Sequence, residues 1–384
     1  MALYLDCNAT TPVDPRVLEA MQPYWSAQMG NPSSRHRAGR IAKEAIDRAR
    51  QKLGRLLQLQ QQEQIVFTGS GTEANHLAIQ GIAATCSAPG TIAVGATEHA
   101  SLRAAVEPLE QLGWRCLLLP VDQNGLLTST AVEQVQRERP ALVSVMVANN
   151  ETGVVQQLEP LIKAATNVGA KIHLDGSQAA GKIALDFAQM GGDCMTLSAH
   201  KLYGPKGVGA LVMRSNLRLR PLLSGGGQES GLRSGTENVP AIVGFGEAAR
   251  VALEEMESSR STLQQCREQL EQGLKRLPGV EIVAQAVQRL PNTVMFLVPA
   301  IEGETLLMQL DQQGAECSSG SACQAGKTAP NPVLTAMGFS PEEASRAIRV
   351  SLCRDIQSEG IVQFLALLER IVSPLVERQR AAWS

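Results

Sequence analysis

The sequence has few aromatic residues and no long apolar run. Phenylalanine, tryptophan and tyrosine together make up 3% of the 384 residues, which disfavours a surface that stacks nucleic-acid bases. No run reaches the roughly 18 apolar residues of a membrane-spanning helix, so we predict no membrane span. The formal net charge of -2 gives no attraction to nucleic acid or to an anionic membrane. The first acidic residue, Asp6, comes too early for a signal peptide, and we expect a cytoplasmic location.

Cysteine occurs eight times, but no two cysteines form a C-x-x-C pair, which disfavours a zinc site. We therefore predict no metal. Thiols of cytoplasmic proteins are mostly reduced, and we expect no disulfide framework in a chain of this length. Cys7 is interpreted as structural. Cys323 differs because it lies in the Gly/Ser-rich segment 317–327, which predicts an exposed, mobile loop with a reactive thiolate; the alternative is a spare exposed thiol.

Short apolar runs alternate with helical patterns in the first two thirds of the chain. The predicted strands are 65–68, 91–95, 115–119, 141–148, 171–174, 193–197 and 207–213. Helical stretches lie between most of them, at 72–85, 101–112 and 158–168. This alternation predicts βαβ units and an α/β fold with a mainly parallel seven-stranded sheet. Only a short Gly/Pro loop separates the last two strands, so one of them is expected to run antiparallel.

The pattern changes after residue 235. A long helix is predicted from about 240 to 277, followed by short strands and further helices, which is typical of an α+β domain. We predict a large domain of residues 13–256. A smaller α+β domain would comprise residues 1–12 and 257–384 and would carry the Cys323 loop at about 317–330.

Polar side chains follow five of the predicted strands. They lie at 68–72, 97–99, 149–150, 175–178 and 198–201. In open α/β sheets, ligands bind beyond the carboxyl ends of the strands. The sequence therefore predicts a binding site at this edge of the sheet.

Two of these residues predict pyridoxal phosphate (PLP) chemistry. Lys201 follows a predicted buried strand, where desolvation favours the neutral amine that attacks an aldehyde; the alternative is a solvated loop lysine. Asp175 could keep the pyridine nitrogen of PLP protonated, or could be an ordinary helix N-cap. Gln178 could donate to the phenolate oxygen of the ring.

Other residues fit the same cofactor and an amino-acid substrate. The glycine-rich turn at 69–71 precedes a helix, whose first N–H groups bind phosphate, and Ser198 and His200 could complete the cup. A plain capping loop is the alternative. His99 could stack on the ring and move protons, or be a structural histidine. Arg349, in an apolar strand, suits an α-carboxylate, or an internal salt bridge.

Together these motifs resemble the cysteine desulfurases, PLP enzymes that feed iron–sulfur cluster assembly. The resemblance covers nearly the whole chain. It rests on LDCNATTP at 5–12, GNPSSRH at 30–36, TEHAS at 97–101, NNETG at 149–153, HLDGSQ at 173–178, SAHKLYGPKG at 198–207, RSGT at 233–236 and SSGSAC at 318–323.

The resemblance implies a PLP fold-type-I architecture and a homodimer with sites at the interface. Lys201 would bind the cofactor covalently, Asp175 and Gln178 would be its ring partners, and His99 the stacking acid or base. The implied phosphate cup comprises Gly71, Thr72, Ser198 and His200, with Thr236 from the other subunit. Asn150 would lie beside the cofactor phenolate and the substrate. Asn31 and Arg349 would hold the substrate carboxylate.

The implied reaction converts L-cysteine to L-alanine. The sulfur would be held as a persulfide on Cys323 and passed to an iron–sulfur scaffold or a sulfur-carrier protein, including carriers for tRNA thiolation. Three departures from the family pattern are Cys7, His76 in place of an asparagine, and the segment 324–327. Three alternatives remain: a PLP-dependent lyase that splits the C–S bond of cysteine or cystine, an aminotransferase, and a binding protein that kept the fold.

Overall fold

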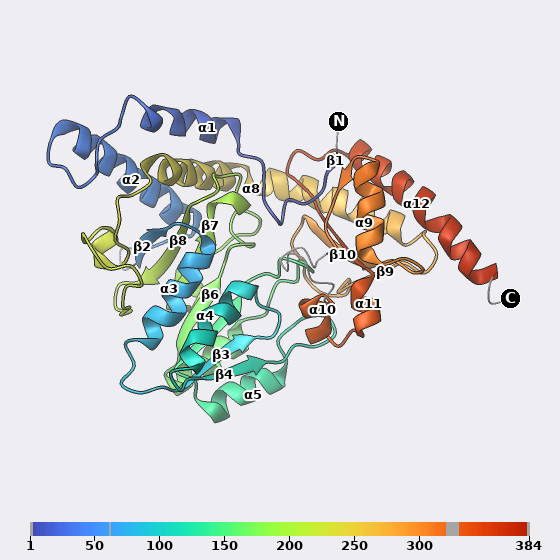
Figure 1. Ribbon diagram of the computed structural model, residues 1–384, viewed down its shortest axis with the longest axis horizontal. Coiled ribbons are helices and arrows are strands. Elements are labelled where there is room, and N and C mark those ends of the chain that lie inside the picture. The colour runs from blue at the N-terminus through green and yellow to red at the C-terminus, as the bar shows by residue number, and fades with distance from the viewer. Residues whose placement is uncertain (1–2, 61–62, 320–329, 382–384) are drawn as a thin grey trace.

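The computed structural model describes residues 3–60, 63–319 and 330–381. Its centre is the predicted seven-stranded sheet (Figure 1). The strands are β2 (Glu63–Thr68), β3 (Thr91–Gly95), β4 (Arg115–Leu119), β5 (Leu142–Met146), β6 (Lys171–Asp175), β7 (Cys194–Ser198) and β8 (Gly209–Arg214), in the order β2-β8-β7-β6-β5-β3-β4. Within this sheet β8 runs antiparallel to both of its neighbours, β2 and β7, and the other pairs are parallel, which confirms the prediction for the last pair.

Helices pack on both faces of the sheet. One face is covered by α2 (Arg37–Leu56), α5 (Ser129–Glu138), α6 (Glu159–Val168) and the first part of α8 (Val239–Leu274), and the other by α3 (Gly71–Ala83) and α4 (Ala100–Glu110). The shorter α1 (Pro15–Met21) lies against α8, and α7 (Phe187–Met190) precedes β7. Successive side chains of a strand point to opposite faces of the sheet, and in β5 both faces are buried. Val143 and Val145 belong to the hydrophobic core on one face, and Leu142 belongs to the core on the other.

A separate hydrophobic core lies in the C-terminal part of the chain. β10 (Thr293–Leu297) pairs antiparallel with β9 (Glu281–Ile282) and β12 (Ala347–Ser351), and β1 (Leu3–Tyr4) pairs parallel with β11 (Ala315–Glu316). The helices here are α9 (Gly303–Gln312), α10 (Pro332–Ala336), α11 (Pro341–Ser345) and α12 (Ser358–Ala381).

The long helix α8 runs from a core beside the large sheet into this C-terminal core (Figure 1). Phe245 packs in the core beside the large sheet, and Leu270 packs in the C-terminal core. Leu5, near the start of the chain, also belongs to the C-terminal core. This packing agrees with the proposed division of the chain, whose boundaries at 12/13 and 256/257 stay a prediction.

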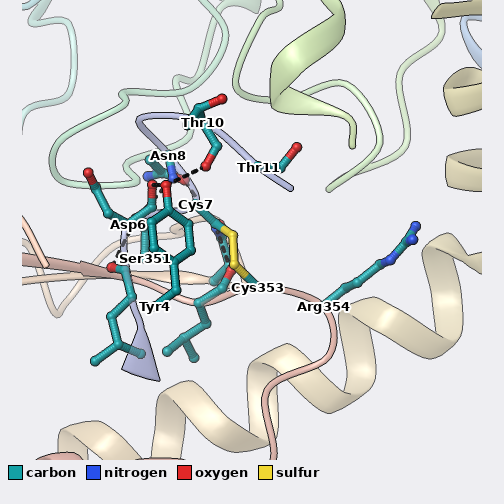
Figure 2. Close-up of a disulfide and its surroundings, with 12 residues drawn as sticks. Tyr4, Asp6, Cys7, Asn8, Thr10, Thr11, Ser351, Cys353 and Arg354 are labelled. Atoms are coloured by element: carbon teal, nitrogen blue, oxygen red, sulfur yellow. Dashed lines mark hydrogen bonds between the residues drawn. A yellow bond between two sulfur atoms is a disulfide. The ribbon is translucent and has the colours of Figure 1, made fainter. Parts of the chain in front are cut away.

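A disulfide joins Cys7 to Cys353, across a sequence separation of 346 residues and a Cα–Cα distance of 5.4 Å (Figure 2). The backbone brings the two residues together, because Cys7 N–H donates to the carbonyl of Ser351 at 3.0 Å. The expectation of reduced thiols is therefore wrong for this pair, although Cys7 is structural as interpreted. The partner of Cys7 could not be read from the sequence because pairing across the two ends of the chain leaves no local pattern.

Among the helices of the described residues, none is long and apolar enough to cross a membrane.

Candidate active site

A cavity of about 360 Å³ opens at the carboxyl ends of the central parallel strands. Because β5, β6 and β7 are adjacent, the loops that follow them meet at one edge. Ten of the residues predicted from the sequence line this cavity: Gly71, Thr72, His99, Asn150, Asp175, Gln178, Ser198, His200, Lys201 and Arg349.

Two of the other predicted residues, Asn31 and Thr236, do not line the cavity, and a third lies outside the described part of the chain. Asn31 is exposed, and its side-chain oxygen accepts from the N–H of Ser33 at 2.9 Å. Thr236 is also exposed. Cys323 lies outside the described residues. The roles assigned to these three residues therefore stay predictions.

Lys201 lies directly after β7, in the short 3-10 turn Ala199–Lys201. Its Nζ donates to the carbonyl oxygens of Asn8 at 2.5 Å and Ala9 at 2.7 Å. The N-terminal segment thus holds the amine at the cavity wall. The asparagine at position 8 was not singled out from the sequence.

Asp175 ends β6 and is 6% exposed. One carboxylate oxygen accepts from the N–H of Ser177 at 2.9 Å, and the other accepts from Asn75 Nδ2 at 3.0 Å. Each oxygen keeps further acceptor capacity. A carboxylate oriented in this way suits a pyridine N–H.

His99 is the N-cap of α4 and reaches the cavity from the end of β3. Its Nδ1 accepts from the backbone N–H of Ser101 at 3.2 Å and lies 2.8 Å from the Ser101 hydroxyl. Burial lowers the pKa of the His99 imidazole; the charge of Asp175 opposes this effect and that of Lys201 adds to it. Burial therefore favours the neutral form of the His99 ring.

The N-terminus of α3 forms a cradle for an anion. A Cβ added to Gly71 would lie 3.2 Å from the Cβ of Ser198, so glycine allows the helix start to approach β7 closely. The first N–H groups of a helix have no intrahelical acceptor and carry partial positive charge. This geometry fits the phosphate of PLP.

His200 lies at the same end of the cavity. Burial lowers the pKa of the His200 imidazole to about 4, with the charges of Lys201 and Lys206 adding to the effect. Its Nδ1 lies 3.1 Å from the hydroxyl of Thr10. His200 is therefore neutral and can act toward a phosphate only as a hydrogen-bond partner.

Gln178 is held by a second lysine, to which no sequence pattern pointed. Lys182 Nζ donates to Gln178 Oε1 at 2.7 Å and to Asn8 Oδ1 at 2.8 Å. With its oxygen engaged, Gln178 directs its Nε2 donor to the carbonyl of Asn8 at 2.9 Å. Burial lowers the pKa of the Lys182 amine well below its usual value, and the charges of Lys201 and Arg349 lower it further.

Arg349 lies in the buried strand β12 and is 3% exposed. Its Nη1 donates to Glu151 Oε1 and its Nη2 to Asp6 Oδ1, both at 2.7 Å. The guanidinium is thus held in an internal ion-pair network while it also lines the cavity. The two interpretations left open by the sequence are compatible.

A comparison with known proteins agrees with this site. The family model described as aminotransferase class-V matches residues 3–364. A relative called cysteine desulfurase IscS, from Dictyoglomus turgidum, is 38% identical over 375 residues, which cover 97% of this chain and 95% of the relative.

The chain belongs to the cysteine desulfurase family.

Solved structures of similar proteins have the same fold. The NifS-like protein from Rickettsia africae matches with a TM-score of 0.89 and 34% identity, over 97% of this chain and 99% of that protein. A structure described as SspA in complex with cysteine matches with a TM-score of 0.79 and 34% identity, over 91% of this chain and 98% of that protein. The fold is therefore that of the PLP fold-type-I desulfurases.

Several site residues were missed by sequence reasoning. They are Asn8, Asn75, Ser101, Glu151 and Lys182. In helix α3, His76 is the residue that departs from the family pattern, yet the preceding residue, Asn75, is the one that lines the cavity. A helical projection of α3 would have found it, since Asn75 lies four residues after Gly71 and so on the same face.

Proposed function

We propose that this protein converts L-cysteine to L-alanine, with PLP bound in the described cavity and Cys323 as the sulfur acceptor. The observation that carries the proposal is the convergence of Lys201, Asp175 and His99 on one cavity in a chain of the desulfurase family. These residue types match a cofactor aldehyde, a pyridine nitrogen and an aromatic ring.

The residues present fit PLP at each of its polar groups. Lys201 supplies the amine for the aldehyde, Asp175 the carboxylate for the pyridine nitrogen, and Gln178 an amide donor for the phenolate oxygen. The cradle formed by Gly71 and Ser198 is suited to the phosphate. When bound, PLP supplies an electron sink that stabilises negative charge at the substrate Cα.

The side chains of this chain carry the remaining steps. The Lys201 amine takes the α-proton of cysteine, and the Cys323 thiolate attacks the substrate sulfur. The substrate C–S bond breaks as the new S–S bond forms. Two protons, the α-proton taken by Lys201 and the proton released by the Cys323 thiol, end on Cα and Cβ of the three-carbon fragment, which leaves as alanine. The balance is cysteine plus a Cys323 thiol, giving alanine plus a Cys323 persulfide.

Arg349 is proposed to bind the α-carboxylate of cysteine, with Asn31 and Asn150 as further substrate contacts. Asn150 Nδ2 donates to Glu151 Oε1 at 2.6 Å, so Asn150 and Arg349 share one carboxylate partner. Because that network fixes the guanidinium before substrate arrives, little side-chain entropy is lost on binding.

The proposed assembly is a homodimer in which Thr236 completes the phosphate site of the other subunit. Its exposed position in the single chain supports this role. The proposed persulfide acceptors are an iron–sulfur scaffold or a sulfur-carrier protein, and the proposed location is the cytoplasm, without direct contact with nucleic acid or membrane.

A direct test uses the purified protein with PLP, L-cysteine and a thiol reductant. We expect an absorption band near the visible edge and equimolar alanine and sulfide. Lys201→Ala should lose the absorption band and the two products. Lys163→Ala, at an exposed position on α6, should keep the band and the products. Pyruvate and ammonia in place of alanine would contradict the proposal and indicate a lyase.

A further inference from the structure

A chain of hydrogen bonds connects Asp175 to His99 through two residues without an assigned role. Asn75 Nδ2 lies 3.0 Å from Asp175 Oδ2 and 2.9 Å from Ser101 Oγ. Ser101 Oγ lies 2.8 Å from His99 Nδ1. Asn75 and Ser101 are 2% and 6% exposed, so bulk water does not compete for these bonds.

The direction of each bond follows from the carboxylate at one end. A carboxylate only accepts hydrogen bonds, so Asn75 must turn its NH2 group toward Asp175. Its second N–H hydrogen then points to Ser101 Oγ. A flipped amide would set its oxygen against the carboxylate of Asp175 and lose that bond, whereas the present orientation leaves only Oδ1 without a partner within the described part of the chain.

The hydroxyl of Ser101 has only one hydrogen to give. Since its oxygen accepts from Asn75, that hydrogen is directed to His99 Nδ1. The backbone N–H of Ser101 points to the same nitrogen at 3.2 Å. Two donors therefore converge on Nδ1, which must be the unprotonated nitrogen of the neutral ring.

We propose that Asn75 and Ser101 are positioning residues that hold His99 as the neutral tautomer with its proton on Nε2. The functional part of this inference rests on the proposed role of His99 in the desulfurase reaction. Nε2 is the nitrogen left for the cavity, so His99 presents an N–H donor to the substrate rather than a lone pair. A neutral imidazole can polarise a substrate in this way without becoming a cation.

The same network opposes protonation of His99. A second proton would have to enter at Nδ1, where it would meet the backbone N–H and the hydroxyl of Ser101, both of which donate to this nitrogen. The charged groups that face His99 are Asp175 from β6 and Lys201 from the turn after β7, with opposite effects on its pKa. Neither charge would change if the Ser101 hydroxyl were removed, so Ser101 can be tested on its own.

The test is an NMR titration of the holoenzyme labelled with 15N-histidine. The chain has five histidines, and His99→Gln assigns the His99 signals. In the wild type we expect a pyrrole-type Nε2 and a pyridine-type Nδ1. In Ser101→Ala we expect the two shifts to converge and the pKa of His99 to rise by about half to one pH unit, the effect of one lost hydrogen bond.

Two further variants separate positioning from general damage. Ser101→Thr keeps the hydroxyl and should restore the wild-type shifts. Ser144→Ala is a matched control, because the Ser144 hydroxyl lies 2.8 Å from Nδ1 of His173; it should alter the signals of His173 and leave those of His99 unchanged.

Two results would overturn the inference: a protonated Nδ1 in the wild type, or His99 signals that do not respond to Ser101→Ala. The shifts are read without substrate. The NMR result therefore does not depend on whether alanine is produced. A failed activity assay would count against the proposed function alone.

Discussion

Arg349 forms a buried ion pair with Glu151, at 2.7 Å between Nη1 and Oε1. Burial raises the pKa of the Glu151 carboxyl, and the guanidinium works in the opposite direction. The pair joins β12 to the loop after β5, and so connects the C-terminal core to the cavity at the large sheet. Its geometry is fixed from both sides, since Asp6 holds the other end of the guanidinium.

Replacing Arg349 by lysine should weaken cysteine binding. Lysine keeps the charge but loses the planar fork, and a charged hydrogen bond contributes about 1.5–3 kcal/mol, which corresponds to an increase in KM of roughly 10- to 100-fold. The increase in KM should exceed the change in kcat. Arg346→Lys, at a half-exposed arginine that pairs with Glu342, is the control. An unchanged KM in Arg349→Lys would remove Arg349 from the substrate site.

Lys182→Met should weaken cofactor binding. The substitution keeps the length of the side chain but removes the donor that fixes Gln178 Oε1, so the amide can rotate away from the cofactor. We expect the dissociation constant for PLP to rise about tenfold, the effect of roughly one hydrogen bond, and the absorption maximum to move. If the titration and the spectrum match those of Lys163→Met, Lys182 has no part in cofactor binding.

The strands of the large sheet and the residues at their ends could be predicted because both are local signals. The run that ends at Asp175 is apolar, and Lys201 follows a similar run, so their place at one sheet edge follows from the βαβ pattern. Asn8 could not be predicted in the same way. It reaches Lys201 from a segment 193 residues away, and only the packing of β1 and the segment after it into the C-terminal core places it there.

Position 7 illustrates the same limit. Its disulfide partner, Cys353, lies two residues after the end of β12, and a single sequence holds no pattern that joins the two. The sequence shows that Cys7 departs from the family pattern. Its pairing with Cys353 follows only from the fold, in which the β-bridge between Asp6 and Ser351 brings the two segments together.

Loss of the disulfide should lower thermal stability without removing the site. The bond closes a loop across 346 residues, for which the chain-entropy model gives about 5–6 kcal/mol. Cys353→Ser should therefore lower Tm by several degrees, whereas Cys86→Ser, at an exposed free thiol, should not. Peptide mapping without reductant should recover the linked pair; two alkylated thiols in the native protein would contradict the bond.

His173 should make the protein less stable in acid. Burial lowers the pKa of its imidazole to about 4 in the folded protein, from the ordinary value of 6.5 for an exposed imidazole. As the pH falls between these values, the unfolded chain binds the proton first and stability is lost. His173→Gln should therefore show a smaller drop in Tm between about pH 7 and about pH 5. An identical drop in the variant and in the wild type would show that burial does not lower the pKa of His173 in the folded protein.

The proposed function depends most on Cys323 as the sulfur acceptor. We would incubate Cys323→Ser with PLP and L-cysteine and measure alanine, together with the absorption of the bound cofactor. We predict that the variant keeps the cofactor band and loses nearly all alanine production, because serine cannot accept the sulfur. Alanine formed at the wild-type rate would contradict the proposal, since the sulfur would then leave cysteine without the Cys323 thiol.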